Sequence, residues 1–246
     1  MGVRTLKLTI SYDGADYSGW QHQWGKRTIQ GELERAFGEL TGVVAKVNGA
    51  SRTDAGVSAM GQVANVTVNS PIPTRNFAKA VNDRLPRDII VSEVVEADET
   101  FDASSFARSK LYRYTIFTGK HRNVLKSRNC WHCPRSLDVS KMDAAAKVLL
   151  GTHDFRSFAA ASDERENSVR TVTRCDVTQE NQWIYVDIEA DRFLHKMVRN
   201  IVGTLVEIGR GRWKPERMQA ILEAKNRTAA GPTAPGEGLC LIRINY

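Results

Sequence analysis

The sequence of 246 residues predicts an α+β protein built from two ferredoxin-like halves, with their sheets side by side and a central cleft. One observation is that strand and helix patterns follow one another in the order β-α-β-β-α-β, which is typical of a ferredoxin-like unit. The other is that this order recurs later in the chain without evident sequence identity. We therefore expect an N-terminal half at residues 1–105 and a C-terminal half at residues 106–246. A substrate site is expected in the cleft between them.

In the first half, Leu6 to Tyr12 alternates apolar with polar residues, as a half-buried strand does. Thr28 is a suitable N-cap for a helix with Ile29, Leu33, Phe37 and Leu40 on one face. The further elements expected are strands at Val43–Val47 and Val63–Val68, a helix from Thr74 that Pro86 stops, and a strand at Ile89–Val95.

In the second half, the same patterns predict strands, helices and two polar loops. The strands are Leu111–Phe117, Thr171–Val177, Trp183–Ile188 and Leu239–Ile244, and the helices are Asp138–Leu150, Leu194–Ile208 and Pro215–Ala224. Ser157–Ser168 is polar and alanine-rich, which indicates a mobile flap, and Thr228–Gly238 is a Pro- and Gly-containing loop.

Composition limits the function. The 35 Lys and Arg residues outnumber the 28 Asp and Glu residues, giving a formal charge of +7 that favours a polyanionic partner such as nucleic acid. No apolar run approaches the roughly 20 residues of a membrane span. The N-terminus lacks the apolar segment of a signal peptide, so a cytoplasmic protein is expected. Cys130 and Cys133 have no second ligand pair at zinc-binding spacing, so we expect free thiols and no metal.

A polar loop, Ala50 to Ala64, lies between the two middle strands of the first half. In extended chain its Arg52 and Asp54 point to the same side. Asp54 either hydrogen-bonds its own turn, as loop aspartates commonly do, or carries chemistry. A second loop, Tyr17–Trp24, either stacks on bases or packs inward through Trp20 and Trp24.

Several motifs resemble one family in order along nearly the whole chain. The motif at Ser51–Val57 with Gly61–Ala64 is similar to the catalytic motif of the tRNA pseudouridine synthase A family. The family's other motifs are matched by Tyr12-Asp13-Gly14, Gly19-Trp20-Gln21, Lys110–Tyr114, Gly151–Phe158, Met197–Thr204, Ala234-Pro235 and Gly238-Leu239. Ser51 and Ser58 depart from the family pattern, in which Gly and His are usual.

The resemblance implies a cofactor-free isomerase that converts uridine to pseudouridine in the anticodon arm of tRNA, at positions 38 to 40 of the tRNA, and acts as a homodimer. It also implies that Asp54 is the nucleophile, with Arg52 and Arg199 as its basic neighbours. Tyr112 would contact the target base, and Leu239 would line the base pocket.

The chemistry fits these residue types. Isomerisation breaks the N1–C1′ bond and joins C5 to C1′ without oxidation, so no redox cofactor or nucleotide is required. A carboxylate can attack covalently or act as a base, and a nearby arginine keeps it ionised. Attack at C1′, addition at C6 and a glycal route all remain open. The base must leave its stack, and an aromatic ring such as Tyr112 offsets that loss. Arg156, Arg165 and Arg170 are candidate phosphate contacts.

Two alternatives are weaker. A noncatalytic RNA-binding protein with a duplicated ferredoxin-like fold would carry the basic-Gly-aromatic run of recognition motifs, which is not present. A metal-dependent nuclease using Asp13, Asp54 and Asp154 would need carboxylates that converge on Mg²⁺, whereas Asp54 has an arginine two residues away.

Overall fold

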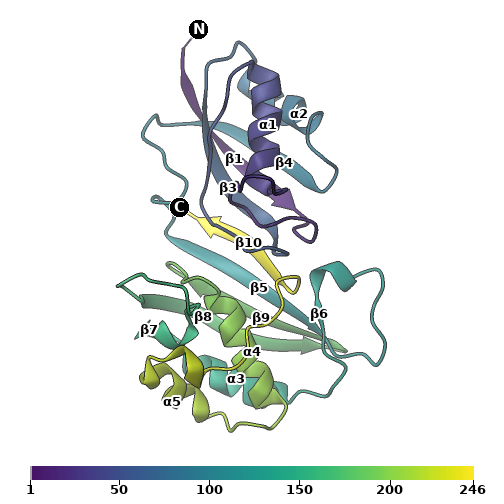
Figure 1. Cartoon of the computed structure of the whole chain (residues 1–246), viewed down its shortest axis with the longest axis vertical. Helices are drawn as coiled ribbons and strands as arrows, with labels where there is room; N and C mark the ends of the chain where they lie inside the picture. Colours follow the sequence, from purple (N-terminus) through teal and green to yellow (C-terminus); the bar gives the residue numbers. More distant parts are fainter. Residues whose placement is uncertain (1) are drawn as a thin grey trace. The chain divides into compact units, whose positions relative to one another are not determined.

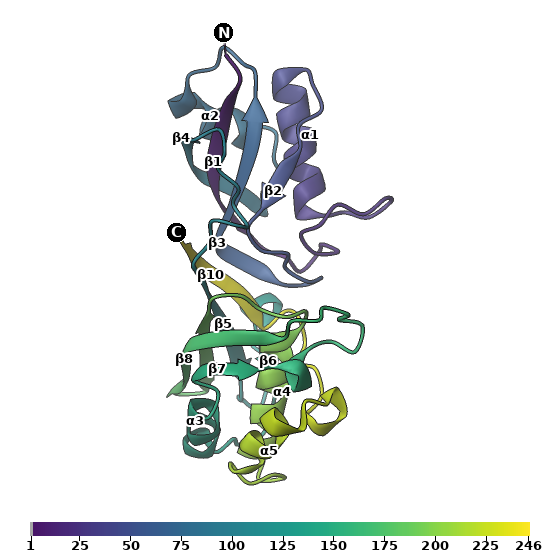
Figure 2. The same ribbon diagram turned by 90° about the vertical axis from the view of Figure 1, so that its left-hand side faces the viewer.

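The computed structural model describes residues 2–246 and divides into two compact units (Figures 1 and 2). Unit 1 holds the chain up to Arg108 together with Leu241–Tyr246, and unit 2 is Ser109–Cys240. The α+β class and the ferredoxin-like order of elements are confirmed. Among the described residues, no helix is both long and apolar enough to cross a membrane.

Unit 1 is an antiparallel sheet with two helices on one face (Figure 1). The sheet order is β4-β1-β3-β10, and β2 also pairs with β3. The elements are β1 (Arg4–Tyr12), α1 (Ile29–Thr41), β2 (Val47–Gly49), β3 (Ser58–Val68), α2 (Thr74–Asn82), β4 (Ile89–Ala97) and, at the end of the chain, β10 (Leu239–Asn245).

The core of unit 1 follows from the predicted patterns. Leu6, Leu8 and Ile10 of β1 are fully buried, and the rings of Phe37 in α1 and Phe77 in α2 stack 6.4 Å apart. Burial of these large apolar side chains is the main force that holds helices to the sheet.

Unit 2 has the sheet order β5-β9-β8-β7, with the short strand β6 parallel to β5 (Figure 2). Its strands are β5 (Ser109–Phe117), β6 (Trp131–His132), β7 (Gly151–Asp154), β8 (Val169–Glu180) and β9 (Trp183–Ala190), and its helices are α3 (Val139–Lys147), α4 (Met197–Gly209) and α5 (Arg217–Ala224). Three single 3-10 turns complete it: η1 (Ser127–Asn129), η2 (Arg156–Phe158) and η3 (Arg227–Ala229).

Some predicted boundaries are wrong. The strand expected at Val43–Val47 is β2, which begins only at Val47, whereas β3 begins at Ser58, directly after the Asp54 turn. The helix expected from Leu194 begins at Met197, because Lys196 adopts a left-handed conformation with φ 60°.

Candidate active site

In unit 1 the loop that carries Asp54 is a tight turn held by main-chain hydrogen bonds. The Val57 N–H donates to the Asp54 carbonyl at 3.2 Å, and the Trp20 N–H donates to the Thr53 carbonyl at 3.0 Å. Gly56 has φ 78°, a left-handed conformation that favours glycine. The Asp54 side chain is half-buried. The main chain on both sides of Asp54 is therefore fixed before any substrate binds.

A buried amide side chain on the neighbouring strand β3 supports this loop. Gln62 of β3 is fully buried and accepts from the Ser51 N–H at 3.1 Å, while its own NH₂ donates to the Ser51 carbonyl at 2.6 Å. The Tyr12 and Thr53 hydroxyls are hydrogen-bonded at 2.8 Å. Together Gln62 and Tyr12 hold the chain on the N-terminal side of Asp54.

Two glycines let neighbouring chain approach the loop closely. A Cβ on Gly14 would lie 2.0 Å from the Val57 carbonyl oxygen, and a Cβ on Gly19 would lie 2.7 Å from that of Thr53. The Gly14 N–H donates to the Ser58 hydroxyl at 3.0 Å, which gives Ser58 a structural role in the place where histidine is usual. The motifs that contain Gly14 and Gly19 thus act as supports for the turn.

The two tryptophans of the neighbouring loop differ in their environment. Trp20 is 2% exposed and packs so closely on Gly49 that a Cβ there would lie 2.3 Å from its ring. The packing interpretation is correct for Trp20. Trp24 is 98% exposed, so its ring is accessible to a ligand.

Arg52 lies in the same loop as Asp54 and is exposed. Within residues 2–246 its guanidinium forms no hydrogen bond or ion pair. An arginine in this state is available to a phosphate group.

In unit 2, Tyr112 and Tyr114 lie on one side of β5, as predicted. Tyr112 is 6% exposed and meets the ring of Phe193 edge-on, with centroids 5.1 Å apart. Tyr114 is fully buried, donates to the Pro235 carbonyl at 2.8 Å, and has its pKa raised by burial. Phe193 was not predicted, and its only signal in the sequence is an apolar residue beside Arg192 just before the helix motif.

Arg199 is a half-buried residue of α4 that is tied to the loop before β10. Its Nε donates to the Ala234 carbonyl at 2.8 Å, and the Ala234 N–H donates to the Arg199 carbonyl at 3.1 Å. Leu239 begins β10 and is 7% exposed, and its N–H donates to the Gly236 carbonyl at 2.9 Å. The loop that leads to Leu239 is therefore fixed on the helix that carries Arg199.

Asn200, on the polar face of α4 next to Arg199, is a buried anchor. It is fully buried, donates to the Phe158 carbonyl at 2.8 Å, and accepts from the Thr233 hydroxyl at 2.6 Å and from Arg227 at 3.2 Å. This part of the polar face points into the protein and joins two loops, rather than facing solvent.

The segment predicted as a flap is anchored at several points. The Ser157 hydroxyl donates to the Ile221 carbonyl at 2.5 Å, and Arg156 donates to the main-chain carbonyls of Asp163 and Glu166, both at 3.1 Å. The Arg165 guanidinium holds the pKa of Asp163 well below its usual range. Arg156 and Arg165 thus have partners inside unit 2.

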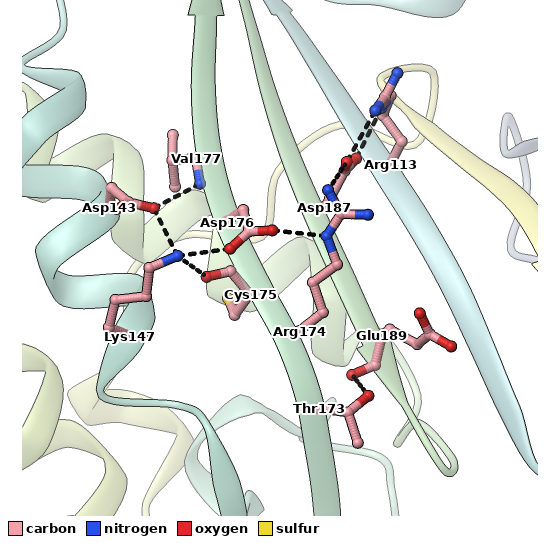
Figure 3. A network of polar contacts seen from close by, with 10 residues as sticks. All are labelled: Arg113, Asp143, Lys147, Thr173, Arg174, Cys175, Asp176, Val177, Asp187 and Glu189. Carbon is pink, nitrogen blue, oxygen red and sulfur yellow. Dashed lines mark hydrogen bonds and ion pairs between the residues drawn. The ribbon is translucent and has the colours of Figure 1, made fainter.

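The face of the unit 2 sheet opposite to Tyr112 and Tyr114 carries a network of paired charges (Figure 3). Arg113 donates to Asp187 through two nitrogens at 2.7 and 2.8 Å, and Arg174 bridges Asp187 and Asp176. Lys147 continues the network to Asp176 and Asp143. Each basic group of this network faces a carboxylate.

The four cysteines form no disulfide within residues 2–246, and Cys130, Cys133 and Cys175 are buried. Among residues 2–246, no group of three or more His, Cys, Asp or Glu side chains is arranged to hold a metal ion.

Comparison with known proteins identifies the class. The family model described as tRNA pseudouridine synthase matches residues 8–106 and 145–246. The chain belongs to the tRNA pseudouridine synthase family, and it is an isomerase that converts uridine to pseudouridine.

Curated relatives specify the branch of this family that the chain most resembles. Proteins named tRNA pseudouridine synthase A from Acetivibrio thermocellus and Moorella thermoacetica are 43% and 46% identical to it. The alignments cover 99% and 98% of this chain and 100% and 99% of those proteins. The relative of the same name from Caldicellulosiruptor bescii is 42% identical over 99% of the chain and 100% of that protein.

Proposed function

We propose that the enzyme isomerises uridines in the anticodon arm of tRNA, with Asp54 as the nucleophile. The observation that carries this proposal is the support around Asp54. Main-chain bonds, the Gln62 amide and the close approach of Gly14 and Gly19 fix the turn from several sides. A carboxylate held before substrate arrives needs no reorganisation during the reaction.

The remaining site residues have complementary roles in this proposal. Tyr112, braced edge-on by Phe193, offers a rigid ring to the extruded base. Arg199, fixed to the loop that leads to Leu239, and the exposed Arg52 supply positive charge to the nucleotide and its phosphates. Leu239 provides an apolar wall for the base.

The reaction can be followed at one atom. C5 of uridine loses its hydrogen when it bonds to C1′, so tRNA tritiated at C5 releases tritium to water. We expect release without an added cofactor. Asp54→Asn keeps the shape of the side chain and removes its charge, and it should abolish release while tRNA still binds. Asp98→Asn makes the same change at an exposed position and should leave the rate unchanged.

The outcome that contradicts the catalytic role is a rate for Asp54→Asn close to that of the parent enzyme. The substrate position has its own test. A tRNA with every anticodon-arm uridine replaced by cytidine should release no tritium from its remaining uridines, and release at the normal rate would refute the anticodon-arm proposal.

We also propose that the enzyme is a homodimer. The proposal is supported by the similarity of the whole chain to relatives named tRNA pseudouridine synthase A. Light scattering after size exclusion measures the mass in solution, and a mass equal to that of one chain, 27.5 kDa, would refute it.

A further inference from the structure

Cationic side chains gather around the Tyr112–Phe193 ring pair in unit 2. Lys110 is two residues before Tyr112 on β5, so both side chains lie on the same face of the strand. Arg192 directly precedes Phe193, and its charge acts on Lys110. Arg165 donates to the Phe193 carbonyl at 3.4 Å.

Arg170 of β8 is the fourth member of this group. The next residue on β8, Thr171, donates its N–H at 3.0 Å to Asp191, the neighbour of Arg192, so Arg170 and Arg192 lie on adjoining segments. Burial and the charges of Arg165 and Arg192 lower the pKa of Arg170, and the charge of Asp191 opposes this effect. We call Lys110, Arg165, Arg170 and Arg192 the cation cluster. Its members come from β5, from β8 and the loop before it, and from the segment after β9, so no single stretch of sequence reveals it.

The cation cluster contrasts with the other face of the same sheet, where Arg113, Arg174 and Lys147 are all paired with aspartates (Figure 3). Within residues 2–246, neither Arg170 nor Arg192 forms an ion pair.

The carboxylates beside the cluster are already engaged. Asp163 binds the Arg165 guanidinium and accepts from the His195 N–H at 2.9 Å. Asp191 accepts from the N–H groups of Thr171 and Arg192 at 3.0 and 2.7 Å. The charges of both aspartates also act on Arg170 and raise its pKa, but within residues 2–246 neither forms an ion pair with it.

Burial makes the charge of Arg170 unfavourable in the absence of an anion. Arg170 is only 8% exposed, and its Nε is buried without a hydrogen-bond partner within residues 2–246. Burial and the charge of Arg192 lower the pKa of Lys110 from 10.5 to about 8. Like charges that are desolvated together destabilise a fold, and they are typical of sites whose counter-charge is a ligand.

We propose that Lys110, Arg170 and Arg192 form a phosphate site that holds the RNA backbone next to the nucleotide bound at Tyr112, with the Arg165–Asp163 pair fixing the segment behind it. The inference rests on the proposed function, because it assigns the ligand of Tyr112 as a nucleotide of RNA. An extruded nucleotide turns about its backbone, so a clamp on a flanking phosphate would hold it in the turned-out position.

The test measures binding of a synthetic anticodon stem-loop RNA by fluorescence anisotropy, with single uncharged methylphosphonate linkages placed on either side of the target uridine. Arg192→Ala changes an exposed side chain and should weaken binding about tenfold, lowering the salt-dependence slope by about one. Arg135→Ala removes the same charge from another exposed position of unit 2 and should leave the Kd within about twofold. Lys110→Met should weaken binding as Arg192→Ala does.

The decisive comparison combines the two changes. One flanking methylphosphonate should weaken binding to the parent enzyme by about the same factor as Arg192→Ala, and it should have little further effect on that variant. The phosphate site would be overturned if each methylphosphonate weakened RNA binding by the same factor in the parent enzyme and in Arg192→Ala. It would also be overturned if Arg192→Ala and Lys110→Met bound the unmodified RNA as tightly as the parent does. These readouts do not depend on turnover, so an enzyme that releases no tritium but shows the coupled losses would refute the proposed function alone.

Discussion

Replacement of Gln62 by methionine should separate the support of the Asp54 loop from its chemistry. The side chain is fully buried and binds both the N–H and the carbonyl of Ser51. Methionine has a similar volume but offers neither a donor nor a good acceptor, so two main-chain groups lose their partners. Each buried group left unsatisfied costs about 1–3 kcal/mol, and we expect the free energy of unfolding to fall by about 3 kcal/mol.

Turnover should fall as well, because Ser51 is only three residues from Asp54. We expect kcat to decrease about tenfold or more with a smaller change in KM, since a positioning residue acts on the geometry of the reacting group rather than on binding. Urea unfolding and tritium-release kinetics on the same preparation measure both effects. Gln219→Met is the matched control, because Gln219 is exposed and, among the residues that the structure describes, its amide donates to Glu223 alone, at 2.6 Å. A Gln62→Met enzyme that is as stable and as fast as the parent would refute the reasoning.

Three further predictions follow from single contacts. Gly14→Ala should lower the free energy of unfolding by about 3 kcal/mol, because its Cβ would meet the Val57 carbonyl. Gly38→Ala in helix α1 should raise it slightly, because its Cβ would lie 3.6 Å from the Val43 carbonyl oxygen. Urea titration measures both changes. Asn200→Leu should cost about 3 kcal/mol by the same assay, through the groups it leaves unpaired in two loops, and a neutral result would contradict its anchoring role. Folding lowers the pKa of Lys110 to about 8, so between about pH 8 and 10.5 the unfolded chain binds more protons than the folded one. The free energy of unfolding of the parent should therefore rise with pH in this range relative to that of Lys110→Met. Parallel plots of the free energy of unfolding against pH for the two proteins would contradict this.

The parts of the fold that the sequence predicted well are those with local causes. Thr28 caps α1 by accepting from the Gly31 N–H, and Asp138 caps α3 by accepting from the Lys141 N–H. Such side-chain-to-backbone bonds join residues three apart, so the pattern is readable in sequence. The Thr28 cap and its apolar stripe predicted α1, and the apolar stripe alone predicted α3.

The start of α4 was mispredicted for a reason that lies outside the helix. The apolar pattern runs back to Leu194, but the His195 N–H donates to the Asp163 carboxylate and its carbonyl accepts from the Ala160 N–H at 2.8 Å. These bonds hold residues 194–196 out of helical geometry. A partner more than thirty residues away cannot be inferred from periodicity.

In the candidate site, too, motifs or local patterns identify some residues, whereas others depend on contacts that are distant in sequence. Asp54 and Tyr112 were selected through motifs, because neither a loop aspartate nor a strand tyrosine is distinctive by itself. Gln62 binds Ser51 from the neighbouring strand, eleven residues away, and Phe193 braces Tyr112 from another segment. These partners depend on the register of strands and the path of loops, which no local pattern determines.

The structure also changes how the motifs themselves should be interpreted. Gly14, Gly19, Gln62 and Asn200 all belong to motifs that resemble the family. In the structure, Gly14, Gly19 and Gln62 contact main chain next to Asp54, and Asn200 donates to the Phe158 carbonyl. Variants at these positions would lose activity without losing a contact to RNA. Loss of activity alone therefore cannot assign a catalytic role in this enzyme. Only a variant that keeps its stability and its affinity for tRNA while turnover fails, as we expect of Asp54→Asn, identifies a residue that acts on the nucleotide.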